Sequence, residues 1–139
     1  MQIVINKCYG GFGISKDAMY QLIIRGSEAI QTSSIDEWAE DDREYFIREL
    51  TEDIDGSYYH RPHSSTLVDL ENEVVYYLDR DDPGVRTDRI LLEIIKESAE
   101  ACNTTHSDLK VVTIPDDVEW EIEEHAGIEW VSEVHRTWG

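Results

Sequence analysis

The sequence predicts an α/β or α+β fold, a single domain at residues 1–139 in which about three helices pack against a mixed β-sheet. A chain of 139 residues is long enough to bury one hydrophobic core. Apolar residues recur at helical spacing in some segments and at strand spacing in others, and Gly, Pro and Asp separate these segments. The resulting order of elements is β-α-α-β-β-α-β-β, which indicates a domain with both element types around one sheet.

The first expected elements are a strand at residues 2 to 7 and a helix that starts after Ser15, a residue type that caps helix N-termini. The apolar residues of this helix recur every three or four positions: Ala18, Met19, Leu22, Ile23 and Ile30. Gly26 is expected to end or bend the helix.

A polar break at residues 31 to 34 leads into a second expected helix, in which Ser34 and Glu37 form a capping box. The apolar residues of this helix are Ile35, Trp38, Ala39, Phe46 and Leu50. Between Asp36 and Asp55 the sequence has ten acids and two arginines. Such a run is either a solvated helix face or a docking surface for a basic partner.

The middle of the chain predicts strands and then a third helix. Residues 57 to 78 are rich in Tyr and Val and predict a hairpin or two strands. The loop signal at residues 79 to 84 is followed by Thr87, which we expect to cap the third helix. The apolar face of that helix consists of Leu91, Ile94, Ile95, Ala99 and Cys102.

The last part of the chain predicts more strands. Residues 109 to 114 are apolar on both faces, which is typical of a central strand. After a turn at residues 115 to 117, apolar residues alternate with glutamates from Val118 to Ile122, so this strand has one wet, acidic face. Residues 128 to 138 predict a further strand or a short helix.

The charge and the cysteines restrict the class of protein. The formal charge of −19, from 31 acids and 12 bases, argues against nucleic-acid polymers and anionic membranes as partners, because both bind clustered Lys and Arg. Any anion-binding site must therefore be a small region where the few bases come together. Cys8 and Cys102 are expected to be reduced thiols, and the chain has no apolar run of signal-peptide or transmembrane length. These features predict a cytoplasmic protein.

A glycine-rich turn between the first strand and Ser15 is the first candidate site. Its bare amides and the helix N-terminus favour a bound anion, while the aromatic residues beside it provide stacking surfaces for a base. The residues assigned to the ligand are Tyr9, Gly10, Gly11 and Phe12. The turn has neither a P-loop motif nor a full dinucleotide fingerprint, so a tight turn with aromatic core residues is the alternative.

Two cationic segments complete the candidate site. Arg86, Thr87 and Asp88 place a cation and a hydroxyl at the start of the third helix, where a phosphate would find complementary charge. Near the C-terminus, Arg136 adds a second cation and Trp138 a stacking face. A capped helix with an exposed arginine, and ordinary terminal surface residues, are the respective alternatives.

No metal, cofactor or catalytic residue is expected. The loop that begins at Asp79 resembles a calcium-binding EF-hand loop, but Pro83 occupies its fifth position and Ile90 its twelfth, where a bidentate glutamate is required. His60 and His63 lack a clear third ligand for zinc. Because the sequence has no nucleophile elbow or other catalytic motif, we expect a binding protein rather than an enzyme.

Four groups of short motifs carry a resemblance to a known family. They are Val4-Ile5-Asn6 with Tyr9 to Ser15, Arg86-Thr87-Asp88, Ile114 to Asp117 with Trp120-Glu121-Ile122, and His135-Arg136-Thr137-Trp138. Together they resemble the first type of phage anti-Thoeris sponges, small proteins of phages and prophages. The resemblance extends over residues 3 to 20, 86 to 102 and 109 to 138.

The resemblance implies a protein that sequesters an immune signal. It implies reversible binding of the cyclic ADP-ribose-type nucleotide made by bacterial TIR enzymes, without cleavage, and in some members of cyclic oligonucleotides of CBASS immunity. It also implies a homo-oligomer, from dimer to hexamer, in the cytoplasm of the host bacterium, and it adds Asn103 to the ligand contacts. The sequence departs from the pattern at Arg89, where a proline is common, and at Thr104, where a glycine is common.

The competing class is an acidic mimic of nucleic acid that inhibits a basic host or defence protein. Its contact surface would combine residues 36 to 55 with residues 116 to 133, where eight acids occur without a lysine or arginine. A mimic depends on these acids, whereas a protein that sequesters an anionic nucleotide depends on the few bases.

Overall fold

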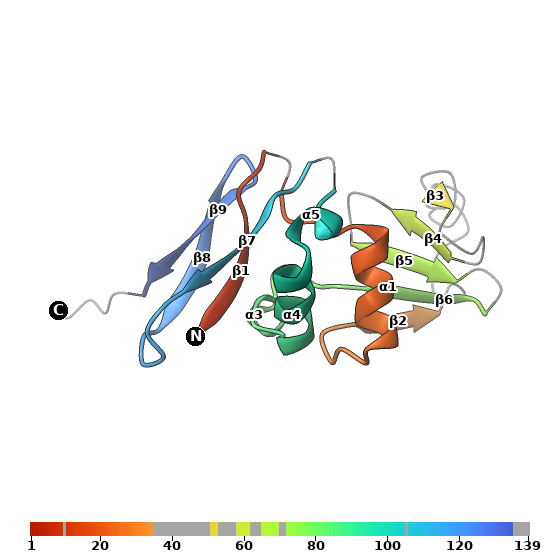
Figure 1. Ribbon diagram of the computed structural model, residues 1–139, viewed down its shortest axis with the longest axis horizontal. Coiled ribbons are helices and arrows are strands. Elements are labelled where there is room, and N and C mark those ends of the chain that lie inside the picture. Colours follow the sequence, from red (N-terminus) through yellow and green to blue (C-terminus); the bar gives the residue numbers. More distant parts are fainter. Residues whose placement is uncertain are drawn as a thin grey trace.

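The computed structural model describes residues 1–9, 11–34, 51–52, 58–61, 65–69, 72–104 and 106–134, with the backbone alone at 51–52 and 58–61. The strands are β1 (Gln2–Asn6), β2 (Gln31–Ser34), β3 (Thr51–Glu52), β4 (Tyr58–Arg61), β5 (Thr66–Asp69), β6 (Val74–Tyr77), β7 (Leu109–Thr113), β8 (Trp120–His125) and β9 (Ile128–Glu133). The helices are α1 (Lys16–Ile24), α3 (Pro83–Arg86), α4 (Arg89–Glu97) and α5 (Ala99–Cys102). Figure 1 shows the helices between two groups of strands, with β2 to β6 on one side and the remaining strands on the other.

The strands confirm the α+β class but not the single mixed sheet. The described strand pairs are all antiparallel and form three sheets, ordered β1-β7, β2-β6-β5-β4-β3 and β8-β9. Within the described residues β7 pairs only with β1, so it is not a central strand. Its apolar character reflects packing against α4 and α5 rather than strands on both sides.

The predicted start and end of α1 are confirmed, with Ser15 at its N-terminus and Gly26 just beyond its C-terminus. The Ser15 side chain accepts a hydrogen bond from the Ala18 amide at 3.1 Å, as an N-cap does. At the other end the helix stops at Ile24, and Gly26, two residues later, adopts a φ of +75°, a conformation common just after a helix. Ile30, which was expected to continue the helical face, therefore lies beyond it.

The third expected helix consists of two helices, and its cap is not Thr87. The Asp88 side chain accepts from the Leu91 amide at 2.9 Å, so Asp88 is the N-cap of α4, while Thr87 ends the short helix α3. Ser98 has extended backbone and separates α4 from α5. Asp88 is a better N-cap than Thr87 because its negative carboxylate also interacts favourably with the positive end of the helix dipole.

The polar break at residues 31 to 34 is a strand, β2. It pairs with β6 at the edge of the five-stranded sheet, where Gln31 and Thr32 are exposed. Edge strands tolerate polar side chains because one face and one side of the strand meet water. The second expected helix, residues 35 to 50, lies outside the described residues.

The remaining strand predictions agree with the structure. The segment 57 to 78 contains β4, β5 and β6, of which β5 and β6 form the expected hairpin. The C-terminal segment contains β9, which forms a hairpin with β8, and the described part of the chain ends at Val134. On β8 the half-buried Trp120 and Ile122 alternate with exposed glutamates, which confirms the wet, acidic face of this strand.

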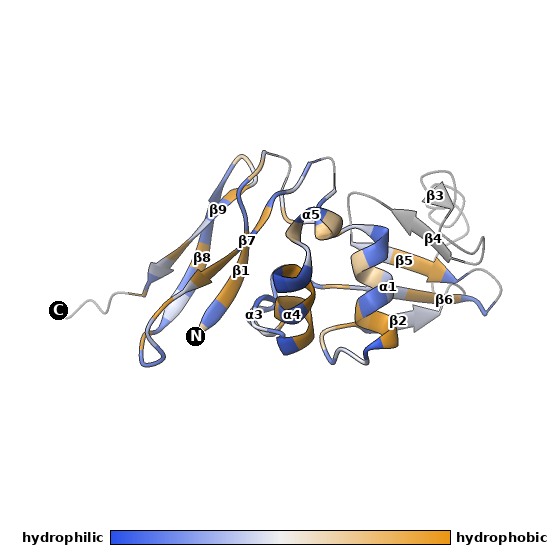
Figure 2. Ribbon diagram, in the orientation of Figure 1, coloured by the Kyte–Doolittle hydropathy of each residue, from blue (hydrophilic) through white to orange (hydrophobic). Residues whose placement is uncertain are grey.

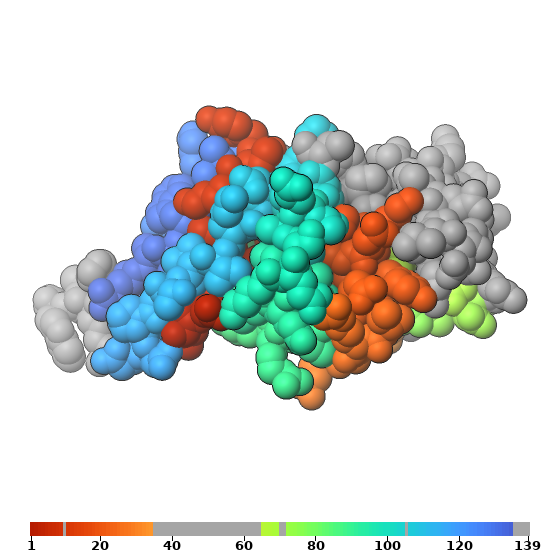
Figure 3. Space-filling model, in the orientation of Figure 1, coloured from red at the N-terminus to blue at the C-terminus, as the bar shows by residue number. Residues whose placement is uncertain are grey.

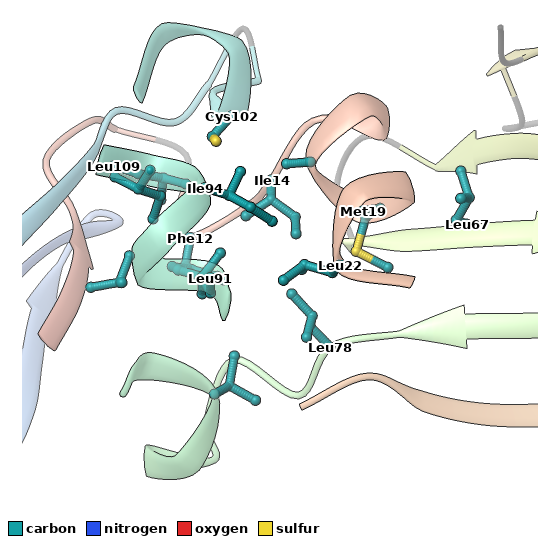
Figure 4. Close-up of a cluster of buried hydrophobic side chains, with 14 residues drawn as sticks. Phe12, Ile14, Met19, Leu22, Leu67, Leu78, Leu91, Ile94, Cys102 and Leu109 are labelled. Carbon is teal, nitrogen blue, oxygen red and sulfur yellow. The ribbon is translucent and has the colours of Figure 1, made fainter. Parts of the chain in front are cut away.

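One continuous core joins the two groups of strands through the helices. Figure 4 shows its labelled side chains converging from β5, β7, the helices and the segment that leads into α1. Its buried members are Val4, Phe12, Ile14, Ala18, Met19, Leu22, Leu67, Leu78, Val85, Leu91, Ile94, Ile95, Cys102 and Leu109. In Figure 2, α4 has a hydrophobic and a hydrophilic face, so this helix buries one side and offers the other to solvent.

Within the described part of the chain no helix is both long and apolar enough to cross a membrane.

Candidate functional site

The glycine-rich turn has the backbone conformation expected of it. Gly11 has a φ of +93°, a region that L residues with a side chain rarely adopt. Phe12 is only 3% exposed and belongs to the core, whereas Tyr9 is 69% exposed. Gly10 lies outside the described residues. Of the two aromatic residues beside this turn, only Tyr9 presents its ring to solvent.

Three of the amides after this turn have partners inside the protein. The Ile14 amide donates to the Ser65 hydroxyl at 3.2 Å, and the Ser15 amide donates to the Cys102 carbonyl at 2.8 Å. Further along, the Ala18 amide is used by the Ser15 cap. The expectation of bare amides is therefore wrong at Ile14 and Ser15, because the turn docks against α5 and the residue before β5.

Arg86 is buried, contrary to the expectation of a surface cation. It is 2% exposed, and its Nη1 and Nη2 donate to the two oxygens of the Glu129 carboxylate at 2.6 and 2.8 Å. Nη1 also donates to the Val4 carbonyl at 3.1 Å and Nε to the Arg80 carbonyl at 3.0 Å. The guanidinium lies 3.9 Å from the centre of the Phe12 ring. Its charge is compensated inside the protein, which leaves little of it for a ligand phosphate.

Asn6 extends this buried cluster, which the sequence analysis did not identify. The Asn6 amide donates to the Glu129 carboxylate at 2.9 Å, and its side-chain Nδ2 donates to the Cys8 and Gly127 carbonyls at 2.7 and 2.8 Å. The cluster of Asn6, Arg86 and Glu129 joins β1, α3 and β9. One signal was visible in the sequence, because an asparagine at the end of an apolar strand needs polar partners when it is buried.

Three other residues that were predicted to contact the ligand make hydrogen bonds within the protein instead. The Asp88 carboxylate caps α4 and also accepts from the Ser27 hydroxyl at 3.0 Å. The Asn103 side chain accepts from the Leu109 amide at 2.8 Å. Thr87 donates to the Pro83 carbonyl at 3.2 Å and is half-buried. Arg136 and Trp138 lie outside the described residues.

Three cavities surround the loop at Arg80 and Asp81, and acids outnumber bases in each. The largest has a volume of about 520 Å³ and is bordered by Phe12 and Tyr77. A cavity of about 300 Å³ lies against β8 and includes Trp120, and one of about 150 Å³ adjoins Gly11. These cavities are poorly suited to a phosphate because their lining carboxylates repel it.

A fourth cavity has the opposite charge balance. It is an open groove of about 470 Å³ lined by Gln2, Thr87, Arg89, Leu92, Glu93 and Lys96. We call it the α4 groove. Four of its residues lie on α4 at positions i, i+3, i+4 and i+7, which share one face of a helix. Figure 3 shows the surface of α4 next to the N-terminal strand on one face of the molecule.

The two bases of the α4 groove differ in how they are held. Lys96 Nζ donates to Oε1 of Gln2 on β1, which fixes the lysine across the groove. Arg89 is exposed, and within the described residues its guanidinium has no hydrogen bond or ion pair. Arg89 and Lys96 are seven residues apart, about 10 Å along the helix axis. This spacing was visible in the sequence, but the helix start at Asp88 was needed to identify the shared face.

A surface ion pair flanks α4 and uses a different set of charges. Arg25 Nη1 and Nη2 donate to the Glu97 carboxylate at 3.1 and 2.8 Å. These hydrogen bonds lower the pKa of Glu97 and raise that of Arg25. Arg25 is therefore occupied by Glu97, so the free positive charge beside α4 comes from Arg89 and Lys96.

The cysteines are free thiols, and burial makes one of them unreactive. Cys102 is 1% exposed, and desolvation raises its pKa to about 11. A thiol with this pKa stays protonated near neutral pH and is a poor nucleophile. Among the described residues no three His, Cys, Asp or Glu side chains lie close enough to hold a metal ion.

No protein-family model, curated protein or solved structure matches this chain.

Proposed function

We propose that the protein binds a small anionic nucleotide in the α4 groove and holds it without cleaving it. One observation carries the proposal: among the four cavities described above, the α4 groove is the one with more bases than acids. In a chain with a formal charge of −19, a phosphate is repelled from most of the surface. An anionic ligand therefore gains most electrostatic attraction at a local pair of bases.

The size and chemistry of the groove fit this class of ligand. A volume of about 470 Å³ lies within the range of about 300–1,000 Å³ that is typical of small-molecule sites. Arg89 and Lys96 provide charge-assisted hydrogen bonds to phosphate oxygens. Leu92, which is half-buried between them, offers an apolar surface to a base or a ribose. The groove thus combines charge for phosphates with an apolar contact for the rest of a nucleotide.

The family resemblance specifies the proposal further. We propose that the ligand is a cyclic ADP-ribose-type immune signal, and that the protein is a homo-oligomeric phage anti-defence protein of the bacterial cytoplasm. Arg89 stands where the family often has a proline, so this chain adds a cation to the segment that carries the resemblance. We assign the phosphate contacts to Arg89 and Lys96 instead of Arg86, because Glu129 neutralises the charge of Arg86.

Calorimetry with a panel of cyclic ADP-ribose isomers and cyclic oligonucleotides tests the proposal. Each charge-assisted hydrogen bond to phosphate contributes about 1.5–3 kcal/mol, so Arg89→Ala and Lys96→Ala should each weaken binding about 10- to 150-fold. Arg80→Ala is the matched control, because Arg80 is also an exposed arginine but lines the acidic cavities. Mass spectrometry should recover the ligand unchanged.

Two results would contradict the proposal. A linear product recovered from the complex would make the protein an enzyme. Binding that is equally affected by Arg80→Ala and Arg89→Ala would place the ligand elsewhere.

The hairpin of β8 and β9, whose exposed face is acidic, supports a second candidate function: the protein would mimic nucleic acid and thereby inhibit a basic protein. Glu121, Glu123 and Glu124 are exposed on β8. Exposed charges are screened over about 8 Å at physiological ionic strength, so a mimic should lose its partner between low and high salt. Changing Asp41, Asp42 and Glu44 to their amides should abolish inhibition by a mimic, and should leave nucleotide affinity unaltered if the acids are merely solvated.

A further inference from the structure

The cavity of about 300 Å³ that lies against β8 has the buried Arg86 and Glu129 side chains in its wall. We call it the β8 cavity. Nη1 and Nη2 of Arg86 donate to both oxygens of Glu129, and the guanidinium lies 3.9 Å from the centre of the Phe12 ring. These contacts fix the orientation of both charged groups. The β8 cavity shares no lining residue with the α4 groove, so the two are separate candidate sites.

The buried ion pair has one hydrogen-bond donor and one acceptor left over. Among the described residues, two backbone carbonyls and the Glu129 carboxylate take four of the five N–H groups of Arg86, which leaves one N–H of Nη2. Oε1 of Glu129 accepts from Arg86 and from the Asn6 amide, whereas Oε2 accepts from Arg86 alone and keeps one lone pair. Because buried polar groups are nearly always hydrogen-bonded, these two unused positions in a cavity wall point to a molecule bound there.

The unused positions place a donor beside an acceptor. Nη2 of Arg86 and Oε2 of Glu129 are 2.8 Å apart. The amides of Asn and Gln present a donor beside an acceptor in the same way when they bind N6 and N7 of adenine. A base whose amino group lies beside a ring nitrogen complements this pattern, because the amino group donates to Oε2 and the ring nitrogen accepts from Nη2.

The rest of the β8 cavity favours an uncharged aromatic ring. Trp120, Ile122 and Pro83 contribute apolar lining, and an indole ring is a surface on which a base stacks. The lining has four carboxylates and two guanidiniums, so it repels a phosphate but not a neutral ring. Its volume lies at the lower end of the range of about 300–1,000 Å³ that is typical of small-molecule sites.

We propose that the β8 cavity is a binding site for an uncharged nucleobase that carries an amino group beside a ring nitrogen, as the base of adenosine does. Arg86 and Glu129 recognise the edge of the base, and Trp120 stacks on its face. The site goes beyond the proposed function, because it does not use the phosphate contacts of the α4 groove.

Calorimetry with two uncharged nucleosides tests the inference on the wild-type protein. Adenosine and purine riboside differ only in the 6-amino group. Adenosine should bind about tenfold or more tightly, because purine riboside leaves the acceptor on Glu129 without a partner. Equal affinities would overturn the inference, as would no binding of either nucleoside, which is the result expected if water alone fills the cavity.

Two tryptophan variants locate the bound adenosine. Trp120→Leu removes the stacking surface and should weaken adenosine binding about fivefold or more. Trp130→Leu is the matched control and should change it less than about twofold, because Trp130 is 40% exposed on β9, donates to Glu123 and does not line the cavity. Urea unfolding verifies that both variants are folded. Equal effects of the two substitutions would overturn the inference.

The variants of the α4 groove separate this inference from the proposed function. Arg89→Ala and Lys96→Ala should leave adenosine binding unchanged, whether or not they weaken the binding of cyclic nucleotides. A loss of adenosine binding in these two variants would place the nucleoside in the α4 groove and overturn the inference. The proposed function fails separately, if both variants bind cyclic nucleotides as the wild-type protein does.

Discussion

Replacing Glu129 with glutamine would leave the Arg86 guanidinium buried without a compensating charge. The Glu129 carboxylate is 6% exposed and accepts three hydrogen bonds of 2.6, 2.8 and 2.9 Å, from Arg86 and from the Asn6 amide. Glutamine keeps the size of the side chain but turns an amide N–H toward these donors. Removing one partner of a buried ion pair costs about 3–5 kcal/mol.

The size of this cost, compared with the free energy of unfolding, decides whether the variant stays folded. Domains of this kind have a free energy of unfolding of about 5–15 kcal/mol, so Glu129→Gln removes a large part of it. At roughly 3–5 °C per kcal/mol for a chain of this length, Tm should fall by about 10–20 °C. Urea unfolding followed by circular dichroism measures the loss, and an unchanged slope would show that the unfolded state is the same.

Two further variants separate the buried charge from general disruption. The double variant Arg86→Met with Glu129→Leu removes both charges and should recover most of the stability, because no uncompensated ion remains. Glu97→Gln breaks the exposed pair with Arg25 and should cost much less. Equal losses in the free energy of unfolding for Glu129→Gln and Glu97→Gln would contradict a cost that arises from the buried charge.

Two predictions follow from the pKa shifts. The pKa of Glu97 is lowered in the folded protein by hydrogen bonds from Arg25, so the unfolded chain binds more protons there. The stability that this pair contributes should be present above pH 4.5 and vanish as the pH falls through the folded pKa, so wild-type protein and Glu97→Gln should converge in urea unfolding at low pH. Cys102, with a pKa of about 11, should resist alkylation at pH 8 in the native protein and react after unfolding; peptide mapping that finds it modified in the native state would contradict its burial.

Local features of the fold were predictable because they depend on residues close together in the sequence. The cap at Ser15 involves an amide three residues away, and the ends of α1 follow from it and from Gly26. The hairpin from β8 to β9 and the wet face of β8 follow from alternation within a few residues. The cap of α4 was predicted one residue early, at Thr87 instead of Asp88, because both residue types cap helices.

The errors concern positions whose environment is set by distant residues. Residues 31 to 34 have a polar sequence that gives no strand signal, and they form β2 because β6 offers them an edge to pair with. The segment around Ser98 has a continuous apolar face, but the backbone there is extended, so two helices replace one. The amides of Ile14 and Ser15 are occupied by partners before β5 and in α5, respectively.

The α+β class follows from the sequence, as do the positions of most helices and strands and the scarcity of bases in an acidic chain. Which bases are exposed and unpaired follows only from the three-dimensional arrangement of the chain. Arg86 is buried because Glu129, 43 residues further along the chain, folds back against it, whereas Arg89 lies on the solvent face of α4. Two arginines three residues apart thus lie in opposite environments, because the availability of a charge depends on long-range partners and burial, which local sequence does not specify.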